Sequence, residues 1–166
     1  MQHIRIIKQL LIILLLGLLT ACQTINSKVG TYFELDTDLQ IDFIVDADIN
    51  PDESGAASPL FIRMYELKKA KMADKADFIG LYERDKKTLG ADMVAKHELK
   101  RFKPGESRSE HFVINKDANY VVLFAEFLDF KDSKFKLIVP VVANNVFQNK
   151  VSIQVTGNEL ILRKEK

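Results

Sequence analysis

The chain has 166 residues, of which 24 are basic and 23 acidic, so its formal net charge is +1. This balance excludes the strong basic excess that is typical of nucleic-acid-binding proteins. The single cysteine excludes an internal disulfide, and the length suits one domain with its own hydrophobic core.

The N-terminus is typical of a secretory signal peptide. An apolar run over residues 10–19 is only about half as long as a membrane-spanning helix. The residues before it that can carry positive charge are His3, Arg5 and Lys8. The run ends in Leu19-Thr20-Ala21-Cys22, which resembles the bacterial lipobox, where small residues precede a cysteine that receives a diacylglyceryl group. We therefore expect cleavage between Ala21 and Cys22, with lipid on the Cys22 thiol and on the amine that cleavage frees.

Removal of residues 1–21 takes away Arg5 and Lys8, so the remaining 145 residues carry 22 basic and 23 acidic side chains. One acyl chain binds a membrane only marginally, whereas two or three hold a protein in place. The residue after the cysteine is Gln23 and not Asp, which in Gram-negative bacteria favours the outer membrane as the destination of a lipoprotein. Residues 22–34 are predicted to be the lipidated cysteine and a tether of roughly 40 Å at full extension. Residues 35–166 are predicted to form the periplasmic domain.

The body is predicted to be mostly β-strand. Apolar residues occupy every odd position from Leu39 to Ile49, a period of two that buries one face of a strand. Turn-type residues such as Pro104-Gly105 and Gly157-Asn158 separate the later strands. These strands are expected at Leu60–Leu67, Met93–Phe102, Ser109–Ile114, Ala118–Leu128, Phe135–Val142, Val151–Thr156 and Glu159–Leu162. About eight strands at hairpin spacing predict a β-sandwich.

One stretch, between Lys68 and Ala91, has a helical period instead. A first short helix is expected over Lys69–Lys75, and Asp77 is placed to cap a second one. The apolar residues of the second helix are Phe78, Leu81, Tyr82 and Leu89. We expect a helical insertion between the second and third strands, with Phe78, Leu81 and Tyr82 as one stripe packed on the sandwich.

The densest acidic stretch, residues 46–53, places oxygen ligands at alternate positions, as a calcium-binding loop does. It has Pro51 where such a loop needs glycine and Ala57 where it needs glutamate. We therefore predict no metal site there, and expect Asp46 and Asp48 on the solvent face of the first strand.

The sequence shows no arrangement of residues that is typical of a catalytic site. His97 and His111 lie far apart in predicted strands without a cysteine beside them, which does not favour a zinc site. Ser107 and Ser109 lack the context of a nucleophile elbow, and no phosphate-binding glycine pattern occurs. Three aromatic residues are expected in the core or on a sheet face rather than in a ligand cage: Phe124, Phe127 and Phe130. We predict a protein that is not an enzyme and needs no cofactor besides the lipid on Cys22.

Several short motifs follow one another in a specific order. Residues 50–67 combine an Asn-Pro loop, a Ser-Pro start and an Arg-x-Tyr-x-Leu strand. Residues 76–82 contain Asp-Phe-x-x-Leu-Tyr, residues 89–92 read Leu-Gly-Ala-Asp, and Pro104-Gly105-Glu106 lies downstream. Together with the lipobox, these motifs resemble the TssJ (SciN) family, the outer-membrane lipoproteins of type VI secretion systems. The resemblance covers nearly the whole mature chain and implies a transthyretin-like β-sandwich with added helices.

The resemblance also implies a partner. Such proteins dock the periplasmic domain of the inner-membrane protein TssM and thereby tie a complex that also contains TssL to the outer membrane. Within the family, the loop between the first two strands is implicated in that contact. Here the loop consists of Asn50, Pro51, Asp52, Glu53, Ser54, Gly55, Ala56, Ala57, Ser58 and Pro59. Its polar and small residues suit an exposed, adaptable binding loop, although a plain connector has the same composition.

Two other classes of protein stay open on the residues alone. A periplasmic lipoprotein that binds a small ligand would need a deep apolar pocket with converging polar groups. An envelope hydrolase or assembly factor would need clustered carboxylates, or a histidine and a carboxylate whose titration is perturbed.

Overall fold

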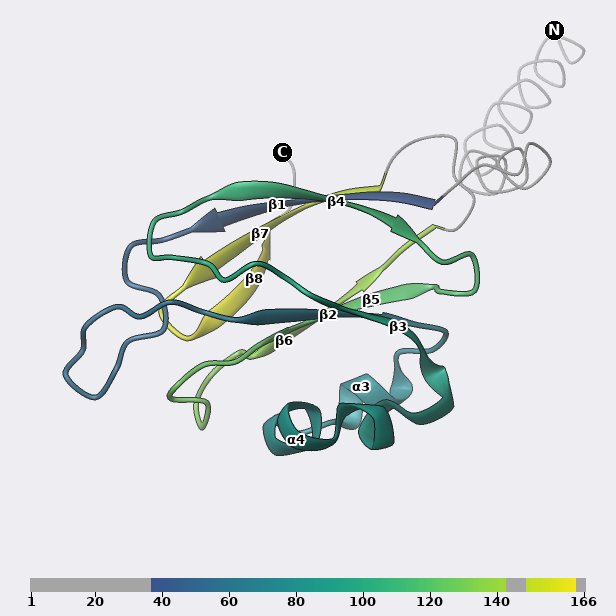
Figure 1. The fold of residues 1–166 in the computed structure, drawn as a ribbon, viewed down its shortest axis with the longest axis horizontal. Coiled ribbons are helices and arrows are strands. Elements are labelled where there is room, and N and C mark those ends of the chain that lie inside the picture. Colours follow the sequence, from purple (N-terminus) through teal and green to yellow (C-terminus); the bar gives the residue numbers. More distant parts are fainter. Residues whose placement is uncertain (1–36, 143–148, 164–166) are drawn as a thin grey trace, which may run out of the picture.

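The computed structural model describes residues 37–142 and 149–163, which contain eight strands, two α-helices and one 3₁₀-helix. Two sheets lie face to face, and the helices lie beneath one of them (Figure 1). This arrangement confirms the predicted β-sandwich with a helical insertion between its second and third strands. The expected signal peptide, Cys22 and the segment 22–34 lie outside the described residues.

The first sheet has the strand order β4-β1-β7-β8. Its central strand β1 pairs with β4 in antiparallel and with β7 in parallel orientation, and β7 and β8 form an antiparallel hairpin. Gly157 in the hairpin turn has a φ of 47°, which glycine adopts without strain. The strands are β1 (Thr37–Val45), β4 (Arg108–Ile114), β7 (Asn149–Thr156) and β8 (Glu159–Arg163).

The second sheet has the strand order β3-β2-β5-β6, and all of its neighbours are antiparallel. Its strands are β2 (Ile62–Leu67), β3 (Met93–Glu98), β5 (Tyr120–Ala125) and β6 (Lys136–Pro140). Strand β5 is buried at five of its six positions because the first sheet covers one of its faces and the helices cover the other.

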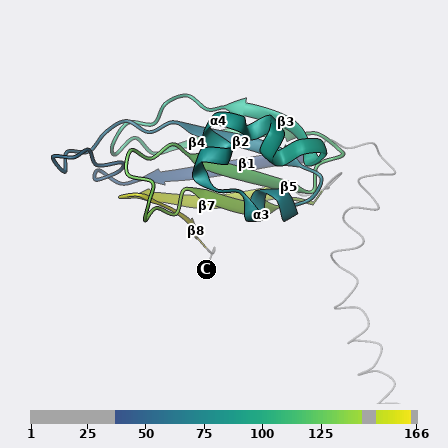
Figure 2. The ribbon, with the colours of Figure 1, turned by 90° about the horizontal axis from the view of Figure 1, so that it is seen from below.

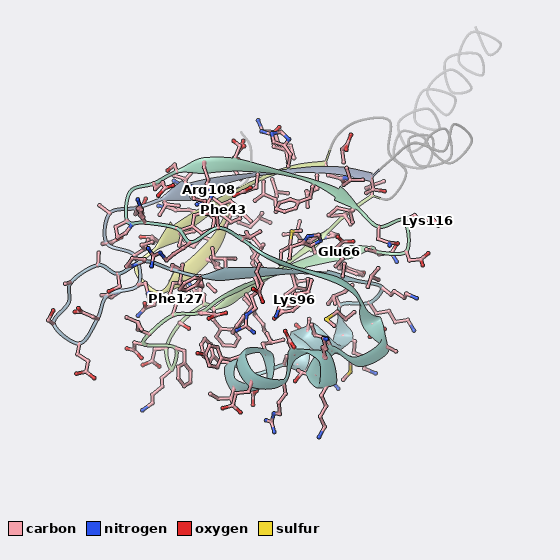
Figure 3. All side chains as sticks on the ribbon, viewed as in Figure 1. Phe43, Glu66, Lys96, Arg108, Lys116 and Phe127 are labelled. Atoms are coloured by element: carbon pink, nitrogen blue, oxygen red, sulfur yellow. The ribbon has the colours of Figure 1, made fainter. Side chains whose placement is uncertain are left out.

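The main hydrophobic core fills the space between the sheets. The alternation that predicted the first strand is confirmed there, because the odd positions of β1 from Leu39 to Val45 are all buried. Ile62 and Met64 of β2 enter the same core from the opposite sheet, while Tyr65 and Leu67 face the helices. Figure 3 labels Phe43 and Phe127, which both belong to this core.

Several predicted strands, including the one expected at Phe135–Val142, end earlier than expected, because hydrogen bonding stops before the apolar pattern does. The first ends at Val45 instead of Ile49, although Ile49 is still buried. The third ends at Glu98, and Phe102 forms only an isolated bridge with Leu60. The predicted strand over residues 118–128 is confined to 120–125.

The helical insertion covers the outer face of the second sheet, over β2 and β5 (Figure 2). It comprises α3 (Lys71–Lys75), α4 (Phe78–Leu89) and the 3₁₀-helix η1 (Gly90–Asp92). Phe78 and Leu81 are buried against the sheet, as predicted, and Leu89 is buried with them. The expectation for Tyr82 is wrong, since 48% of it is exposed and its ring lies over the guanidinium group of Arg63 at 5.4 Å.

Polar contacts fix the insertion at several points. The Asp77 carboxylate caps α4 by accepting a hydrogen bond from Gly80 N at 2.7 Å, as predicted. Arg63 donates to the carbonyl oxygens of Leu81 and Tyr82, just before α4 leaves helical geometry at Arg84.

Another of these points is Lys136 on β6. Its Nζ donates at 2.6–2.8 Å to the carbonyl oxygens that end α3, those of Ala73, Asp74 and Ala76. Burial lowers the pKa of Lys136, yet these carbonyls are partners for its charged form.

Candidate partner-binding surface

The loop Asn50–Pro59 lies at one end of the sandwich, which we call the distal end. Three other connections meet it there: β3 to β4, β5 to β6, and β7 to β8 (Figure 1, left). Asn50 N donates to Gly157 O at 2.8 Å, and Gly105 N donates to Asp46 O at 3.0 Å. The surface at the distal end is therefore built from segments that are far apart in the sequence.

Asn50 anchors the base of the loop to its surroundings. Only 2% of this residue is exposed, and its φ of 50° is one that Asn tolerates better than most residues. Its Nδ2 donates to Pro59 O at 3.0 Å, and its Oδ1 accepts from Leu128 N at 2.8 Å. One buried side chain thus joins the two ends of the loop to the β5–β6 connection.

The tip of the loop is a turn held by Asp52. Its Oδ1 accepts hydrogen bonds from Ser54 Oγ at 2.6 Å, Ser54 N at 2.9 Å and Ala56 N at 3.0 Å. The Ser54 hydroxyl and the Ala56 amide lower the pKa of Asp52. Gly55 has a φ of 81°, which closes the turn. The exposed residues 52–57 therefore have a defined shape.

An open groove of about 590 Å³ lies between the loop and the β5–β6 connection. It is lined by Pro51, Asp52, Glu53, Leu128, Asp129 and Asn158. Three of these are carboxylates, and no cation is among the lining residues. The Asn158 Oδ1 atom is buried and accepts no hydrogen bond from any described residue. The groove therefore offers acceptors to a partner that brings donors or positive charge.

Two apolar side chains beside the loop are exposed, Phe61 by 51% and Leu128 by 60%. A hydrogen bond from Glu126 N to Phe61 O at 2.9 Å joins their segments. The sequence analysis did not assign Phe61, Leu128, Asp129 or Asn158 to a site. No local pattern places the β5–β6 and β7–β8 connections beside residues 50–59, because their proximity follows from the sheet topology.

The distal end is opposite to the end at which the described chain begins. Thr37, at the start of β1, pairs with Ile114, and β1 runs from there towards the loop (Figure 1). A nine-residue strand is about 30 Å long. Thr37 is therefore separated from the loop by about the length of the sandwich.

The acidic stretch 46–53 does not form a single cluster of ligands. Asp46 Oδ2 accepts from Gln154 Nε2 at 2.7 Å, Asp48 Oδ1 accepts from Gly157 N at 3.3 Å, and Asp52 holds its own turn. Asp46 and Asp48 lie in the turn after β1 and not on the strand itself. Over residues 37–142 and 149–163, no three His, Cys, Asp or Glu side chains are grouped to hold a metal ion.

The two histidines occupy different environments. His97 on β3 contacts Glu66 Oε1 at 2.6 Å, while Glu66 Oε2 accepts from Asn115 N at 2.8 Å. Glu66 is buried between the sheets (Figure 3), so this pair links the second sheet to the turn after β4. His111 is exposed on β4.

The serines and phenylalanines considered in the sequence have structural contacts. Ser107 Oγ accepts from Val45 N at 2.9 Å, and Ser109 Oγ donates to Asp42 Oδ1 at 2.6 Å. Phe124 and Phe127 are buried, which confirms the expected core packing. Phe130 stacks on Phe78 with 4.2 Å between ring centroids.

The lipobox cysteine, Cys22, cannot be placed on this surface because it lies outside the described residues. Among the residues that the structure does describe, no helix has the length and apolar character to cross a membrane.

Comparison with known proteins identifies the family. A family model described as type VI secretion lipoprotein (T6SS-SciN; VasD, EvfM, TssJ) matches residues 37–158. No curated protein gives a significant match.

Several solved structures share the fold. The T6SS lipoprotein TssJ1 from Pseudomonas aeruginosa is 24% identical, with a TM-score of 0.70 over 79% of this chain and 99% of that chain. Serratia marcescens Lip, a membrane-bound component of the type VI secretion system, is 18% identical, with a TM-score of 0.70 over 80% and 99%. A chain in a structure described as the TssM C-terminal domain from EAEC is 23% identical, with a TM-score of 0.65 over 77% and 98%.

These structural likenesses establish the fold, whereas the family model covers most of the chain, including the loop and the helical insertion. This chain therefore belongs to the family of type VI secretion lipoproteins.

Proposed function

We propose that this chain is a lipid-anchored adaptor that ties a type VI secretion membrane complex to the outer membrane. In this proposal residues 1–21 are removed, and Cys22 carries the diacylglyceryl and N-acyl groups. Residues 22–34 connect the lipid to a periplasmic domain formed by residues 35–166. The lipobox, Gln23 and membership of a lipoprotein family support this anchoring.

The proposed partner is the periplasmic domain of a TssM-like inner-membrane protein, within a complex that also contains TssL. The similarity to a chain in the structure described as the TssM C-terminal domain supports this choice. The loop Asn50–Pro59 would supply part of the contact. The observation that carries the proposal is the position of this preformed loop at the end of the sandwich opposite to Thr37.

The preformed turn makes binding less costly. Its conformation is held by Asp52 in the free protein, so little backbone entropy is lost when a partner contacts it. Phe61 and Leu128 provide apolar area beside the turn. The carboxylates of Asp52, Glu53 and Asp129 would attract basic groups and act on the association rate more than on the final affinity. These are features of a non-catalytic docking surface.

A pull-down from detergent-solubilised membranes tests the partner. The bait is the mature lipoprotein, and its matched control carries a Gly-Ser linker in place of residues 52–57. We expect the native bait to capture a TssM-like protein and the control to capture much less. Failure of the native bait would reject the adaptor function, while equal capture by both would place the interface elsewhere on the sandwich.

Membrane fractionation tests the anchor. We expect Cys22→Ser to release the protein from outer membranes without changing its melting temperature, because Cys22 precedes every described strand. The experiment needs cells that lack the partner, since the partner would otherwise retain the protein. Continued sedimentation of the Cys22→Ser protein with outer membranes in such cells would contradict the anchor.

A further inference from the structure

The helical insertion and the connection before it expose a group of cations, which we call the basic helical face. It consists of Lys68, Lys69, Lys71, Lys75, Arg84, Lys86 and Lys87, all of them exposed. Within the described residues none of these seven forms an ion pair, whereas Arg63, Lys96 and Arg108 are all paired. No direct ion pair with a described residue therefore neutralises any of these seven charges.

Two carboxylates in the same segment, Asp85 and Asp77, are engaged with other groups, while Asp74 and Glu83 are exposed. Asp85 contacts Lys96 Nζ at 3.0 Å and accepts from Tyr65 Oη, so it points towards the sheet. Asp77 caps α4, and both it and Asp74 lie near enough to Lys136 to favour its charged form. The exposed surface of the insertion is consequently more basic than its composition indicates.

An apolar side chain lies among these cations. A shallow groove of about 320 Å³ between the two helices is lined by Met72, Lys75, Ala76, Arg84, Lys87 and Thr88. Met72 is 43% exposed, and it is unbranched and flexible. Cations around an exposed apolar side chain match a phospholipid surface, where phosphates lie above the first acyl carbons.

The basic helical face begins at the end of the sandwich where the described chain starts. Leu67, which precedes Lys68, accepts a hydrogen bond from Asn119 N in the turn between β4 and β5. Strand β4 ends at Ile114, which pairs with Thr37. Lys116 belongs to the same end (Figure 3, right), and from Lys68 the helices extend along the outer face of the second sheet (Figure 2).

The chain between Cys22 and Thr37 limits how far the body can lie from a membrane. Fourteen residues, 23–36, separate them, which amounts to at most about 50 Å. This is comparable to the size of the body, so a basic face near Thr37 would be held at high effective concentration beside the headgroups.

We propose that the basic helical face rests on the anionic phospholipid headgroups of the membrane that holds the lipid anchor, with the distal end directed away from that membrane. This proposal rests on the lipidation of Cys22. Each cation near an anionic surface adds a favourable electrostatic contribution, which salt screens. Docking would restrict the tumbling of the tethered body and keep the loop Asn50–Pro59 presented to the periplasm.

Fluorescence quenching by brominated lipids tests the orientation in the mature lipidated protein. The chain contains no tryptophan, so Met72→Trp introduces a single probe on the basic helical face, and Leu128→Trp introduces one at the distal end. Each protein is inserted through its lipid into vesicles of brominated phosphatidylcholine, with or without brominated phosphatidylglycerol. Mass spectrometry of the same samples establishes whether Cys22 is acylated.

Charge reversal supplies the matched comparison. Lys68→Glu, Lys69→Glu and Lys71→Glu remove charge from the basic helical face. Lys100→Glu, Arg101→Glu and Lys103→Glu make the same change in net charge near the distal end, also at exposed positions. Thermal melts of both triple variants establish that they are folded.

We expect strong quenching of the Met72→Trp probe only in vesicles with phosphatidylglycerol, and loss of this quenching in high salt or after reversal of residues 68–71. The distal reversal should leave the quenching unchanged, and the Leu128→Trp probe should stay unquenched.

If the protein is acylated but its Met72→Trp probe is not quenched, the docking is wrong while the anchor stands. The same holds if both charge reversals reduce the quenching equally. Loss of partner binding, but not of quenching, after reversal of residues 68–71 would assign the face to a protein and also overturn the proposal. A protein without acyl groups would overturn the anchor and the orientation together.

Discussion

Two segments project from the sandwich, the loop Asn50–Pro59 and the helical insertion, and they are stabilised by different interactions. The loop has a polar framework, in which Asn50 anchors the base and Asp52 forms the tip. The insertion buries Phe78, Leu81 and Leu89 against a second hydrophobic cluster on the sheet. A segment held by a few hydrogen bonds can present its surface to a partner, whereas a segment that buries apolar residues contributes to stability.

The motifs that carried the family resemblance lie in these two regions. Arg63 and Tyr65 of the Arg-x-Tyr-x-Leu strand face the insertion, where Arg63 binds the carbonyls of α4 and Tyr65 Oη donates to Asp85 at 3.2 Å. These motif residues therefore hold the helices in place and do not themselves form the proposed docking surface. The Asn-Pro motif, in contrast, builds the base of the loop.

The largest effect is expected in the insertion. Leu81 is fully buried, so Leu81→Ala should lower the free energy of unfolding by about 2–5 kcal/mol. Chemical denaturation measures this value. Ile79→Ala in the same helix is the control, because Ile79 is exposed and its truncation should cost little. Equal losses in the two variants would contradict the packing described for α4.

A smaller effect is expected at the base of the loop. Asn50→Ala leaves Leu128 N and Pro59 O without their partner, which should lower the free energy of unfolding by about 1–3 kcal/mol. It should also weaken partner binding, because the loop loses its anchor. Asn50→Gly removes the same hydrogen bonds but tolerates the positive φ, so it should be the milder change. A stable Asn50→Ala protein with native affinity would show that the polar framework is dispensable.

The smallest effect concerns acid titration. Burial alone would raise the pKa of Asp85, but its contacts with Lys96 and Lys86 N leave it lowered, and hydrogen bonds lower the pKa of Asp52. A carboxylate with a lowered folded-state pKa stabilises the fold above its unfolded pKa, near 3.8 here, and this stabilisation is lost as pH falls through the folded value.

Two substitutions use this difference. Lys96→Met should raise the pKa of Asp85 and reduce stability more at neutral pH than in acid. Ser54→Ala should raise the pKa of exposed Asp52 with almost no change in melting temperature. Carboxyl NMR titration and melts across pH 2–7 measure both effects. If Ser54→Ala changed the melting temperature more than Lys96→Met does, the loop and not the insertion would contribute more to stability.

The sequence predicted the parts of the fold that follow from local pattern. Alternation placed β1, helical spacing placed α4, and the Asp77 cap was visible as a residue type just before an apolar stripe. Strand ends were less predictable, because residues such as Ile49 and Phe102 stay buried after ladder pairing has stopped. Tyr82 was misplaced because its ring covers the Arg63 cation, a contact with another element of the fold.

The candidate site was predictable only in part. The loop itself was indicated by the family resemblance, but the buried role of Asn50 depends on Leu128, which is 78 residues away in the sequence. The lining residues Asp129 and Asn158 likewise reach the loop only through the sheet order. A local motif can therefore indicate a candidate binding segment without revealing the framework that shapes it.

Binding calorimetry is the most direct test of the adaptor function. The mature chain with Cys22→Ser is titrated with the periplasmic domain of a TssM-like protein, and compared with the same chain carrying a Gly-Ser linker at residues 52–57. We predict binding without lipid, metal or cofactor, and an affinity about tenfold or more weaker for the linker variant, equivalent to about 1.4 kcal/mol. The melting temperatures of the two proteins should agree, because residues 52–57 are exposed. Absence of binding by the chain with the native loop would contradict the account, and equal affinities would remove the loop from the interface.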